Sequence, residues 1–384
     1  MTSGQDRKYQ RPQPVASVRP PLMILADDLT GACDAAVAFT TACAPVRVHI
    51  NCEPSEGACI EATTTESRDL PVAEAETRTR NIVERLPSHV ELFKKVDSVF
   101  RGNTIAEIAA TLRHARYDLA LLAPAYPALG RTVREGILYI RDTAGDRTLP
   151  VAELLTKSGC SLTALPAGLP PEALAAAMRR CLSDSTPAVL CDASDPIDLE
   201  RLVSSARSLG KRILWIGSGG LAHALARELP AQTTRSMPKP FVGNTIFFIG
   251  TPHPVTRTQV EHLRSTTQIT EHRNGSMHSP ASDLLVPVLL DETTPDEIRR
   301  ALAAHDPSRI GCFFLTGGDT AHFVCRALGI RALRLLREFA PGVPLAIAEG
   351  GPFDGVTVVL KSGGFGEPDL LCRLLEMCNP EVTA

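Results

Sequence analysis

The sequence predicts an α/β protein with two α/β domains, mainly parallel sheets and a ligand cleft between the domains. Three observations lead to this prediction. Short apolar runs alternate with polar turns and helix-period segments, which is the pattern of parallel strands joined by helices. The 384 residues exceed the size of about 250 to 300 residues at which a single core stops growing. Residues 230–243 contain three prolines and no periodicity, as an interdomain linker does.

These features give the domain organisation. We expect a disordered polar tail over residues 1–20, a first domain over 21–229, the linker over 230–243 and a second domain over 244–384. In the first domain, apolar runs predict strands at 22–26, 46–50, 60–64, 92–96, 119–123, 188–191 and 212–216. In the second domain they predict strands at 245–249, 284–290, 312–315 and 356–360.

Helices are expected after most of these strands. They are predicted from Ala32, over 72–86, over 104–113, from Leu221, over 255–263, up to Leu328 and at the C-terminus. Pro71 stands where the first residue of a helix tolerates proline. Thr104 and Glu107 have the spacing of a capping box.

The composition excludes several classes of function. The formal net charge is −3 and only 4% of residues are aromatic, so we expect no nucleic-acid partner. No apolar stretch reaches the roughly 18 residues of a membrane helix, and the first 20 residues lack the apolar centre of a signal peptide. The eleven cysteines include no C-x-x-C pair, which favours free thiols in a cytoplasmic protein. Small-molecule chemistry is therefore the favoured class.

The second domain carries glycines and hydroxyl residues after three predicted strands. These are Gly250 with Thr251, the run Thr316 to Thr320, and the run Lys361 to Gly366. Loops after parallel strands meet at one edge of a sheet, where backbone N–H groups and helix N-termini bind phosphate. The pattern predicts a nucleotide phosphate site, without the P-loop motif.

A fourth glycine loop, Gly217 to Ala222, formally matches a dinucleotide-binding fingerprint. No acidic residue occurs between Glu228 and Glu261, where the ribose-binding carboxylate should be. We therefore favour close packing of the helix against the strand as the reason for these glycines. A dehydrogenase that uses this loop stays as an alternative.

The first domain combines acidic, basic and hydroxyl residues directly after its strands. They are Asp27, Asp28, Thr30, Arg68, Lys95, Asp97, Ser98, Arg101, Asn103 and Arg131. Each alone would be read as a helix cap or a solvated charge. Together they suit a polyhydroxy acid, because cations bind its carboxylate, carboxylates bind its hydroxyls, and phosphoryl transfer to a hydroxyl needs a base.

Several strings together resemble the four-carbon acid sugar kinase family. They are Leu25-Ala-Asp-Asp-Leu-Thr-Gly-Ala32, Lys94-Lys-Val-Asp-Ser-Val-Phe-Arg-Gly-Asn103, Pro124-Ala-Tyr-Pro-Ala-Leu-Gly-Arg131, Leu315-Thr-Gly-Gly-Asp-Thr-Ala321 and Lys361-Ser-Gly-Gly-Phe-Gly366. The resemblance implies a sugar-acid-binding domain followed by a nucleotide-binding domain. It also implies phosphorylation by ATP of the terminal hydroxyl of threonate, erythronate or 3-oxo-tetronate.

By motif, the resemblance assigns sugar binding to Asp27, Asp28, Arg68, Lys95, Asp97, Ser98 and Arg101. It assigns ATP binding to Thr251, Gly317, Gly318, Asp319, Thr320 and Gly364. Two segments depart from the family pattern. Gly136 to Pro150 lacks the usual Gly-x-Pro-Leu segment, and Gly250-Thr-Pro-His253 replaces a Gly-Ser-x-Ser string.

We therefore predict an ATP-dependent kinase that closes around the sugar acid and Mg²⁺-ATP. Asp28 is the expected base, with Asp27 as the second candidate. Lys95 and Arg101 are expected to hold the carboxylate or the transferring charge, and the Gly317 loop is expected to hold phosphate together with Lys361, Gly363 and Gly364. A two-lobed metabolite-binding sensor is the non-enzymatic alternative. A homodimer, the stereochemistry of the acid and the Mg²⁺ ligands stay open.

Overall fold

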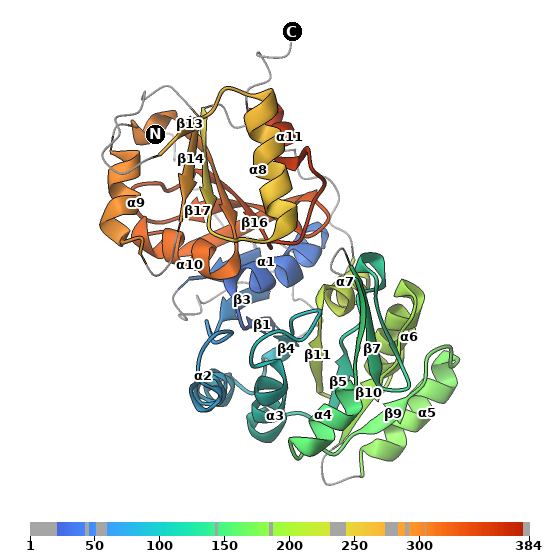
Figure 1. The fold of residues 1–384 in the computed structure, drawn as a ribbon. Helices are drawn as coiled ribbons and strands as arrows, with labels where there is room; N and C mark the ends of the chain where they lie inside the picture. Colours follow the sequence, from blue (N-terminus) through green and yellow to red (C-terminus); the bar gives the residue numbers. More distant parts are fainter. Residues whose placement is uncertain are drawn as a thin grey trace, which may run out of the picture.

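The structure is a computed structural model that describes residues 21–42, 46–50, 60–142, 145–183, 187–230, 243–272, 283–288, 292–303 and 305–378. The predicted tail, the linker from 231 to 242 and the last two residues of the predicted strand 284–290 lie outside the described residues. We call residues 21–230 the N-terminal lobe and residues 243–378 the C-terminal lobe. Figure 1 shows them as two bodies that meet at α1 (Leu29–Val37).

The predicted α/β class is confirmed, since the described residues form a large and mainly parallel sheet. The N-terminal lobe contributes eight parallel strands in the order β9 (Thr163–Leu165), β10 (Ala188–Cys191), β5 (Leu119–Ala123), β11 (Ile213–Gly217), β4 (Glu91–Lys95), β1 (Leu22–Ala26), β3 (Ile60–Thr64) and β2 (Val46–His49). The C-terminal lobe contributes β16 (Ala332–Ala340), β17 (Val343–Glu349), β18 (Thr357–Lys361), β15 (Ile310–Thr316), β12 (Asn244–Ile249), β14 (Leu284–Pro287) and β13 (Thr270–Glu271).

The sheets of the two lobes are joined into one. β16 pairs antiparallel with β2, with Arg334 opposite Arg47, and β16 pairs antiparallel with β17 on its other side. Glu349 on β17 accepts hydrogen bonds from Arg47 Nε at 2.9 Å and Arg334 Nε at 3.2 Å. One carboxylate thus lies between two arginines that would otherwise repel each other across the junction.

Helices cover the sheet in both lobes. Those of the N-terminal lobe are α1, α2 (Val72–Arg85), α3 (Thr104–His114), α4 (Val151–Lys157), α5 (Pro171–Cys181), α6 (Pro196–Arg207) and α7 (Gly219–Arg227). Those of the C-terminal lobe are α8 (Pro254–Thr266), α9 (Pro295–Leu302), α10 (Gly318–Ala327) and α11 (Leu370–Cys378). Short 3₁₀ segments occupy Ala38–Thr41, Pro127–Leu129 and Pro307–Arg309. The described part of the chain contains no helix that is both long and apolar enough to cross a membrane.

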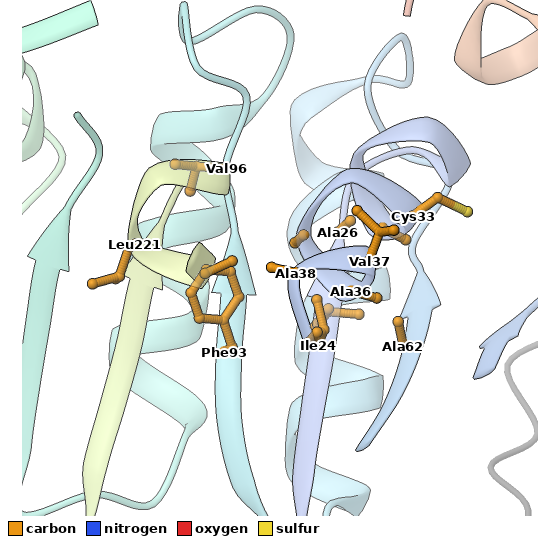
Figure 2. Close-up of a cluster of buried hydrophobic side chains, with 14 of the residues drawn as sticks. Ile24, Ala26, Cys33, Ala36, Val37, Ala38, Ala62, Phe93, Val96 and Leu221 are labelled. Atoms are coloured by element: carbon orange, nitrogen blue, oxygen red, sulfur yellow. The ribbon is translucent and has the colours of Figure 1, made fainter. Parts of the chain in front are cut away.

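Helix α1 is the element that both lobes share. All nine of its residues are buried, and it packs on β1, β2 and β3 as well as on α10 and β16. Figure 2 shows Ala36 and Val37 beside Ile24 and Ala62, with Phe93 and Leu221 on the neighbouring elements. Because most of its side chains are small, other elements can approach α1 closely from both lobes.

Three strands form a separate antiparallel sheet that the sequence did not predict: β6 (Arg131–Arg134), β7 (Ile137–Asp142) and β8 (Gly145–Leu149). The four first residues of β8, Gly-Asp-Arg-Thr, are exposed and lack the apolar run that marks a buried strand. β16 and β17 were missed as well. Both follow the α10 segment as a hairpin, and β16 mixes arginines with its apolar residues.

The predicted capping box of Thr104 and Glu107 is wrong. Asn103 stands at the N-cap of α3 without a side-chain cap bond, and the Thr104 hydroxyl donates to the Arg101 carbonyl at 2.8 Å. Glu107 is instead buried, where it accepts hydrogen bonds from Lys94 Nζ at 2.6 Å and from the Ser67 hydroxyl. A buried lysine on β4 therefore draws the carboxylate away from the helix end.

Candidate functional site

A cavity of about 200 Å³ lies between the two lobes, as the sequence predicted. Its N-terminal-lobe lining consists of Asp28, Thr30, Gly31, Asp34, Arg68, Lys95, Asp97, Ser98, Val99, Arg101, Arg131 and Arg147. Its C-terminal-lobe lining consists of His253, Gly342, Pro344, Leu360, Ser362, Gly364 and Phe365. The aspartate, arginine and lysine side chains all come from the N-terminal lobe, whereas the C-terminal lobe contributes mainly glycines and apolar residues with His253 and Ser362.

Asp27 and Asp28 follow β1 at the edge of the sheet. Asp28 Oδ1 accepts from the Gly31 backbone N–H at 2.8 Å, so Asp28 caps α1. Its Oδ2 accepts from the Thr30 hydroxyl at 2.8 Å and from Arg68 Nη1 at 2.5 Å. Arg68 Nε also donates to Asp27 Oδ2 at 2.8 Å. The two carboxylates therefore hold the side chain of Arg68, which lies in the loop that follows β3.

Arg68 is charged at every accessible pH. Burial alone would lower the pKa of its guanidinium, but Asp28, Asp27 and Asp97 outweigh burial and raise the pKa further. The side chain is 12% exposed, so it presents a fixed positive charge to the cavity.

Asp97 organises the loop after β4. Its Oδ1 accepts from the backbone N–H groups of Val99 and Arg101, and its Oδ2 accepts from Arg101 Nη2 at 2.6 Å. Burial would raise the pKa of Asp97, but Arg101 and then Arg68 hold it well below its usual range. Asp97 is thus a permanent anion whose bonds hold Arg101 at the cavity.

Hydrogen bonds to side chains at the start of α3 hold the loop that carries Arg68. Asn103 Nδ2 donates to the carbonyls of Ser67 and Leu70, both at 2.8 Å. The Ser67 hydroxyl donates to Glu107, which also pairs with Lys94. Asn103 was predicted to bind substrate, but its side-chain amide donates into this loop and Asn103 is not among the residues that line the cavity.

The three glycine loops of the C-terminal lobe meet as predicted. A Cβ on Gly317 would lie 3.6 Å from Thr251 Cβ, and a Cβ on Gly363 would lie 2.8 Å from Thr251 Oγ1. Gly317 has φ +98°, a conformation that favours glycine, and it precedes α10. A Cβ on Gly318 would collide with the Asp28 carboxylate, so the start of α10 abuts the sugar-acid motif of the other lobe.

Lys361 lies beneath one of these loops rather than in the cavity. Its Nζ donates to Thr256 Oγ1 at 2.9 Å, to the Ser362 carbonyl at 3.0 Å and to the Gly363 carbonyl at 2.9 Å. Burial lowers the pKa of Lys361 to about 7. The ammonium group therefore ties the start of α8 to the glycine loop from inside the protein.

Lys361→Met is expected to flatten the rise of stability with pH between about pH 7 and pH 10. An unfolded lysine has a pKa of about 10.4. Between the two pKa values the unfolded chain binds a proton that the folded chain does not, so the wild-type free energy of unfolding increases as pH rises. Denaturant unfolding near pH 7 and pH 9 measures this slope. Equal slopes for wild type and variant would contradict the effect, and Lys157→Met, at an exposed lysine, is the control.

Asp319 faces a second cavity, of about 800 Å³, whose other lining residues include Glu66, Asp69, His322 and Arg326. Burial raises the pKa of Asp319 to about 6, and the neighbouring carboxylates of Asp69, Asp28 and Glu66 add to the rise. A cation beside Asp319 would relieve this accumulation of negative charge.

Other residues of the protein pack closely against the Gly217 loop. A Cβ on Gly219 would lie 2.6 Å from the Tyr126 ring, and a Cβ on Gly220 would lie 2.5 Å from the Ala125 carbonyl. The Ser218 hydroxyl donates to the same carbonyl at 3.0 Å. These contacts agree with close packing of α7, the interpretation that the sequence favoured over a dinucleotide site.

The structure brings most of the predicted sugar-acid residues to one cavity. Those that line it are Asp28, Thr30, Arg68, Lys95, Asp97, Ser98, Arg101 and Arg131, with Gly364 from the predicted nucleotide set. Asp27 lies behind Arg68, and the other predicted nucleotide residues lie outside this lining. Sequence reasoning missed Asp34, Arg147 and Phe365. One feature of the sequence could have indicated Asp34. It follows Gly31 by three residues, which places both residues on the same face of the helix.

Comparison with known proteins supports the order of the two lobes. A model described as a sugar-binding N-terminal domain matches residues 22–225, and one described as a nucleotide-binding C-terminal domain matches residues 296–371. Two solved proteins, from Salmonella typhimurium LT2 and Haemophilus influenzae, share the fold with TM-scores of 0.74 and 0.69 at 20% and 19% identity. Each alignment covers 92% of this chain, and it covers 98% and 99% of the respective solved chain.

Curated relatives are similar over nearly the whole chain. A D-threonate kinase from Bordetella bronchiseptica is 34% identical over 92% of this chain and 96% of its own length. A D-threonate kinase from Cupriavidus necator is 31% identical over 90% and 94%. A 3-oxo-tetronate kinase from Methylobacterium radiotolerans is 27% identical over 92% and 98%. The chain belongs to the four-carbon acid sugar kinase family.

Proposed function

We propose that this protein is an ATP-dependent kinase that phosphorylates the terminal hydroxyl of a four-carbon sugar acid. The observation that carries the proposal is the contact between the lobes, where Gly318 at the start of α10 abuts the Asp28 carboxylate. A phosphate at the N-terminus of α10 would thereby lie beside a carboxylate and the fixed charge of Arg68. Those are the parts that phosphoryl transfer to a hydroxyl requires.

In this proposal Asp28 takes the proton of the attacking hydroxyl. Arg68 neutralises charge on the transferring phosphoryl group, since Asp27 and Asp28 hold it rigidly at the junction. Arg101 and Arg131, which line the same cavity, receive the carboxylate of the acid.

ATP would be held by the C-terminal loops around Gly317, Thr251 and Gly364, where glycines allow backbone N–H groups to approach phosphate. Mg²⁺ usually takes one or two carboxylates together with phosphate oxygens and water. Asp319 fits that requirement, because burial and neighbouring acids disfavour its charge unless a cation is present. When bound, Mg²⁺ supplies neutralisation of phosphate charge.

The substrate we favour first is D-threonate, because two relatives above 30% identity are named D-threonate kinases. Erythronate and 3-oxo-tetronate are the next candidates. We also propose a cytoplasmic location, since the eight described cysteines are free thiols and seven of them are buried.

A coupled ADP-release assay over these acids tests the function. Turnover is expected to require both a four-carbon acid and Mg²⁺, without reduction of NAD. Binding of the acid without ATP turnover would instead support a metabolite sensor, and NAD reduction without ATP would support a dehydrogenase. Turnover of a different substrate class, with none for these acids, would overturn the proposal.

Gly318→Ala is expected to lower kcat about 10²-fold, because the added Cβ collides with the Asp28 carboxylate and displaces the two lobes at the reacting groups. The variant should still fold, since alanine favours the helix more than glycine does. Steady-state kinetics and thermal unfolding measure the two effects. Gly355→Ala is the control for kcat only, since its Cβ would meet no atom within 4 Å. Because the backbone there has φ +87°, this control should lower the melting temperature while kcat stays at the wild-type value. Wild-type kcat in Gly318→Ala would contradict the predicted contact.

A further inference from the structure

Asp34 lines the cavity and is not used by any contact described so far. It lies on α1, is 7% exposed, and its Oδ2 is 3.7 Å from Lys95 Nζ. Its Oδ1 is buried and has no hydrogen-bond partner among the described residues. Burial also raises the pKa of Asp34.

An unsatisfied buried polar atom destabilises a folded protein, and native structures satisfy most such atoms. The described residues offer little to satisfy Asp34. On the side of α7, a Cβ on Gly219 would lie 3.0 Å from Asp34 Oδ2 and 2.6 Å from the Tyr126 ring. His223, also on α7, interacts with Asp34 electrostatically, but no described side chain donates a hydrogen bond to Oδ1. Because Asp34 lines the cavity, a ligand there is the remaining source of a donor.

The other two carboxylates of the cavity differ from Asp34. Asp28 accepts from Gly31, Thr30 and Arg68, and both oxygens of Asp97 accept hydrogen bonds from its own loop. Among the carboxylates that line the cavity, Asp34 therefore has the most unused acceptor capacity.

The distance between Asp34 and Lys95 indicates the class of group that fits. At 3.7 Å the two side chains form an ion pair but exceed the 2.7–3.2 Å of a hydrogen bond. A hydroxyl both donates and accepts, so it can donate to Asp34 and accept from Lys95. A carboxylate or phosphate of the ligand would be repelled by Asp34.

We propose that Asp34, together with Lys95, binds a hydroxyl of the sugar acid other than the one that is phosphorylated. The start of α10 abuts Asp28 rather than Asp34, so the phosphoryl acceptor belongs beside Asp28. Asp34 is then left for the 2- or 3-hydroxyl, which makes it a determinant of which acid is accepted. This inference rests on the proposed sugar-acid kinase function.

The test compares wild type and Asp34→Ala on D-threonate and on its 2-deoxy and 3-deoxy analogues. In wild type, removal of the hydroxyl that Asp34 binds should lower kcat/KM about 10- to 100-fold, as expected for a hydrogen bond to a charged group. In Asp34→Ala the same removal should have almost no effect, because the partner is already gone. Asp34→Asn keeps the shape and should restore part of the discrimination.

Asp192→Asn is the matched control, because Asp192 is a buried carboxylate outside the cavity that accepts from the Glu135 and Gly136 N–H groups. It should retain the wild-type preference among the three acids. Undiminished discrimination in Asp34→Ala would overturn the inference, and so would an equal loss on all three acids in both Asp34 variants. If wild type turns over none of the acids, the kinase proposal fails separately. Calorimetric binding of the same acids then tests Asp34 by the same comparison.

Discussion

Asp28→Asn should lower kcat by ~10²- to 10⁴-fold, the usual effect of removing a general base. The binding of the sugar acid should change much less. Asparagine retains the size of the side chain and caps a helix as well as aspartate does, so the bond to the Gly31 N–H survives. Arg68 loses one carboxylate but keeps Asp27 and Asp97 as partners, so the melting temperature should fall only slightly. Steady-state kinetics and thermal unfolding of the same preparation separate catalysis from folding.

Asp28 also holds Arg68, and loosening of this arginine is a second way to lose activity. Asp27→Asn is the matched control, because Asp27 accepts from Arg68 Nε at 2.8 Å but does not line the cavity. If Asp28 is the base, Asp28→Asn should be far more damaging than Asp27→Asn. Equal losses would assign the effect to the position of Arg68, and near-wild-type kcat in Asp28→Asn would reject the base assignment.

Lys94→Met should reduce the free energy of unfolding by ~3–5 kcal/mol, because it leaves the Glu107 carboxylate buried without its cation. Both side chains are 1% exposed. The loss is a large share of the 5–15 kcal/mol that typically stabilises a domain, so unfolding in denaturant should be measured at low temperature.

The double variant Lys94→Met/Glu107→Gln gives the sharper result. Glutamine can still accept from the Ser67 hydroxyl without burying a charge, so most of the lost stability should return. Lys157→Met breaks an exposed pair with Glu153 and should change stability by less than about 1 kcal/mol. A double variant as unstable as Lys94→Met would show that the buried charge is not the cause.

Strands buried on both faces could be predicted from the sequence to within about one residue. β1, β3, β5 and β10 agree with their predicted bounds, and β4, β11 and β18 are shifted by one residue. Most of them are short apolar runs closed by a polar turn. β16 could not be predicted in this way. It contains Arg334 and Arg337, and the carboxylate that pairs with Arg334 comes from Glu349 on the neighbouring strand β17. Such pairing between distant segments leaves no local signal.

The site residues also divide into those that the sequence could predict and those that it could not. Asp28, Arg68 and Asp97 could be found because each lies in the loop that follows a buried strand, where parallel sheets place their ligand sites. Asp34 lies inside a helix of small residues, so the sequence alone does not distinguish it from an ordinary helix residue. Only the cavity identifies it as a candidate binding residue. Arg147 reaches the cavity from β8 of the small antiparallel sheet, and Phe365 reaches it from the loop after β18. Neither placement follows from the local sequence, because both depend on contacts between distant segments.

The pairing of β2 with β16 limits how the protein can be divided. Each of these strands lies at the border of its lobe, so a fragment cut between residues 231 and 242 would expose an unpaired sheet edge on either half. Exposed edges promote aggregation. For the same reason a chimera that takes one half from a relative must preserve the register of Arg47 against Arg334, together with the Glu349 carboxylate that binds both.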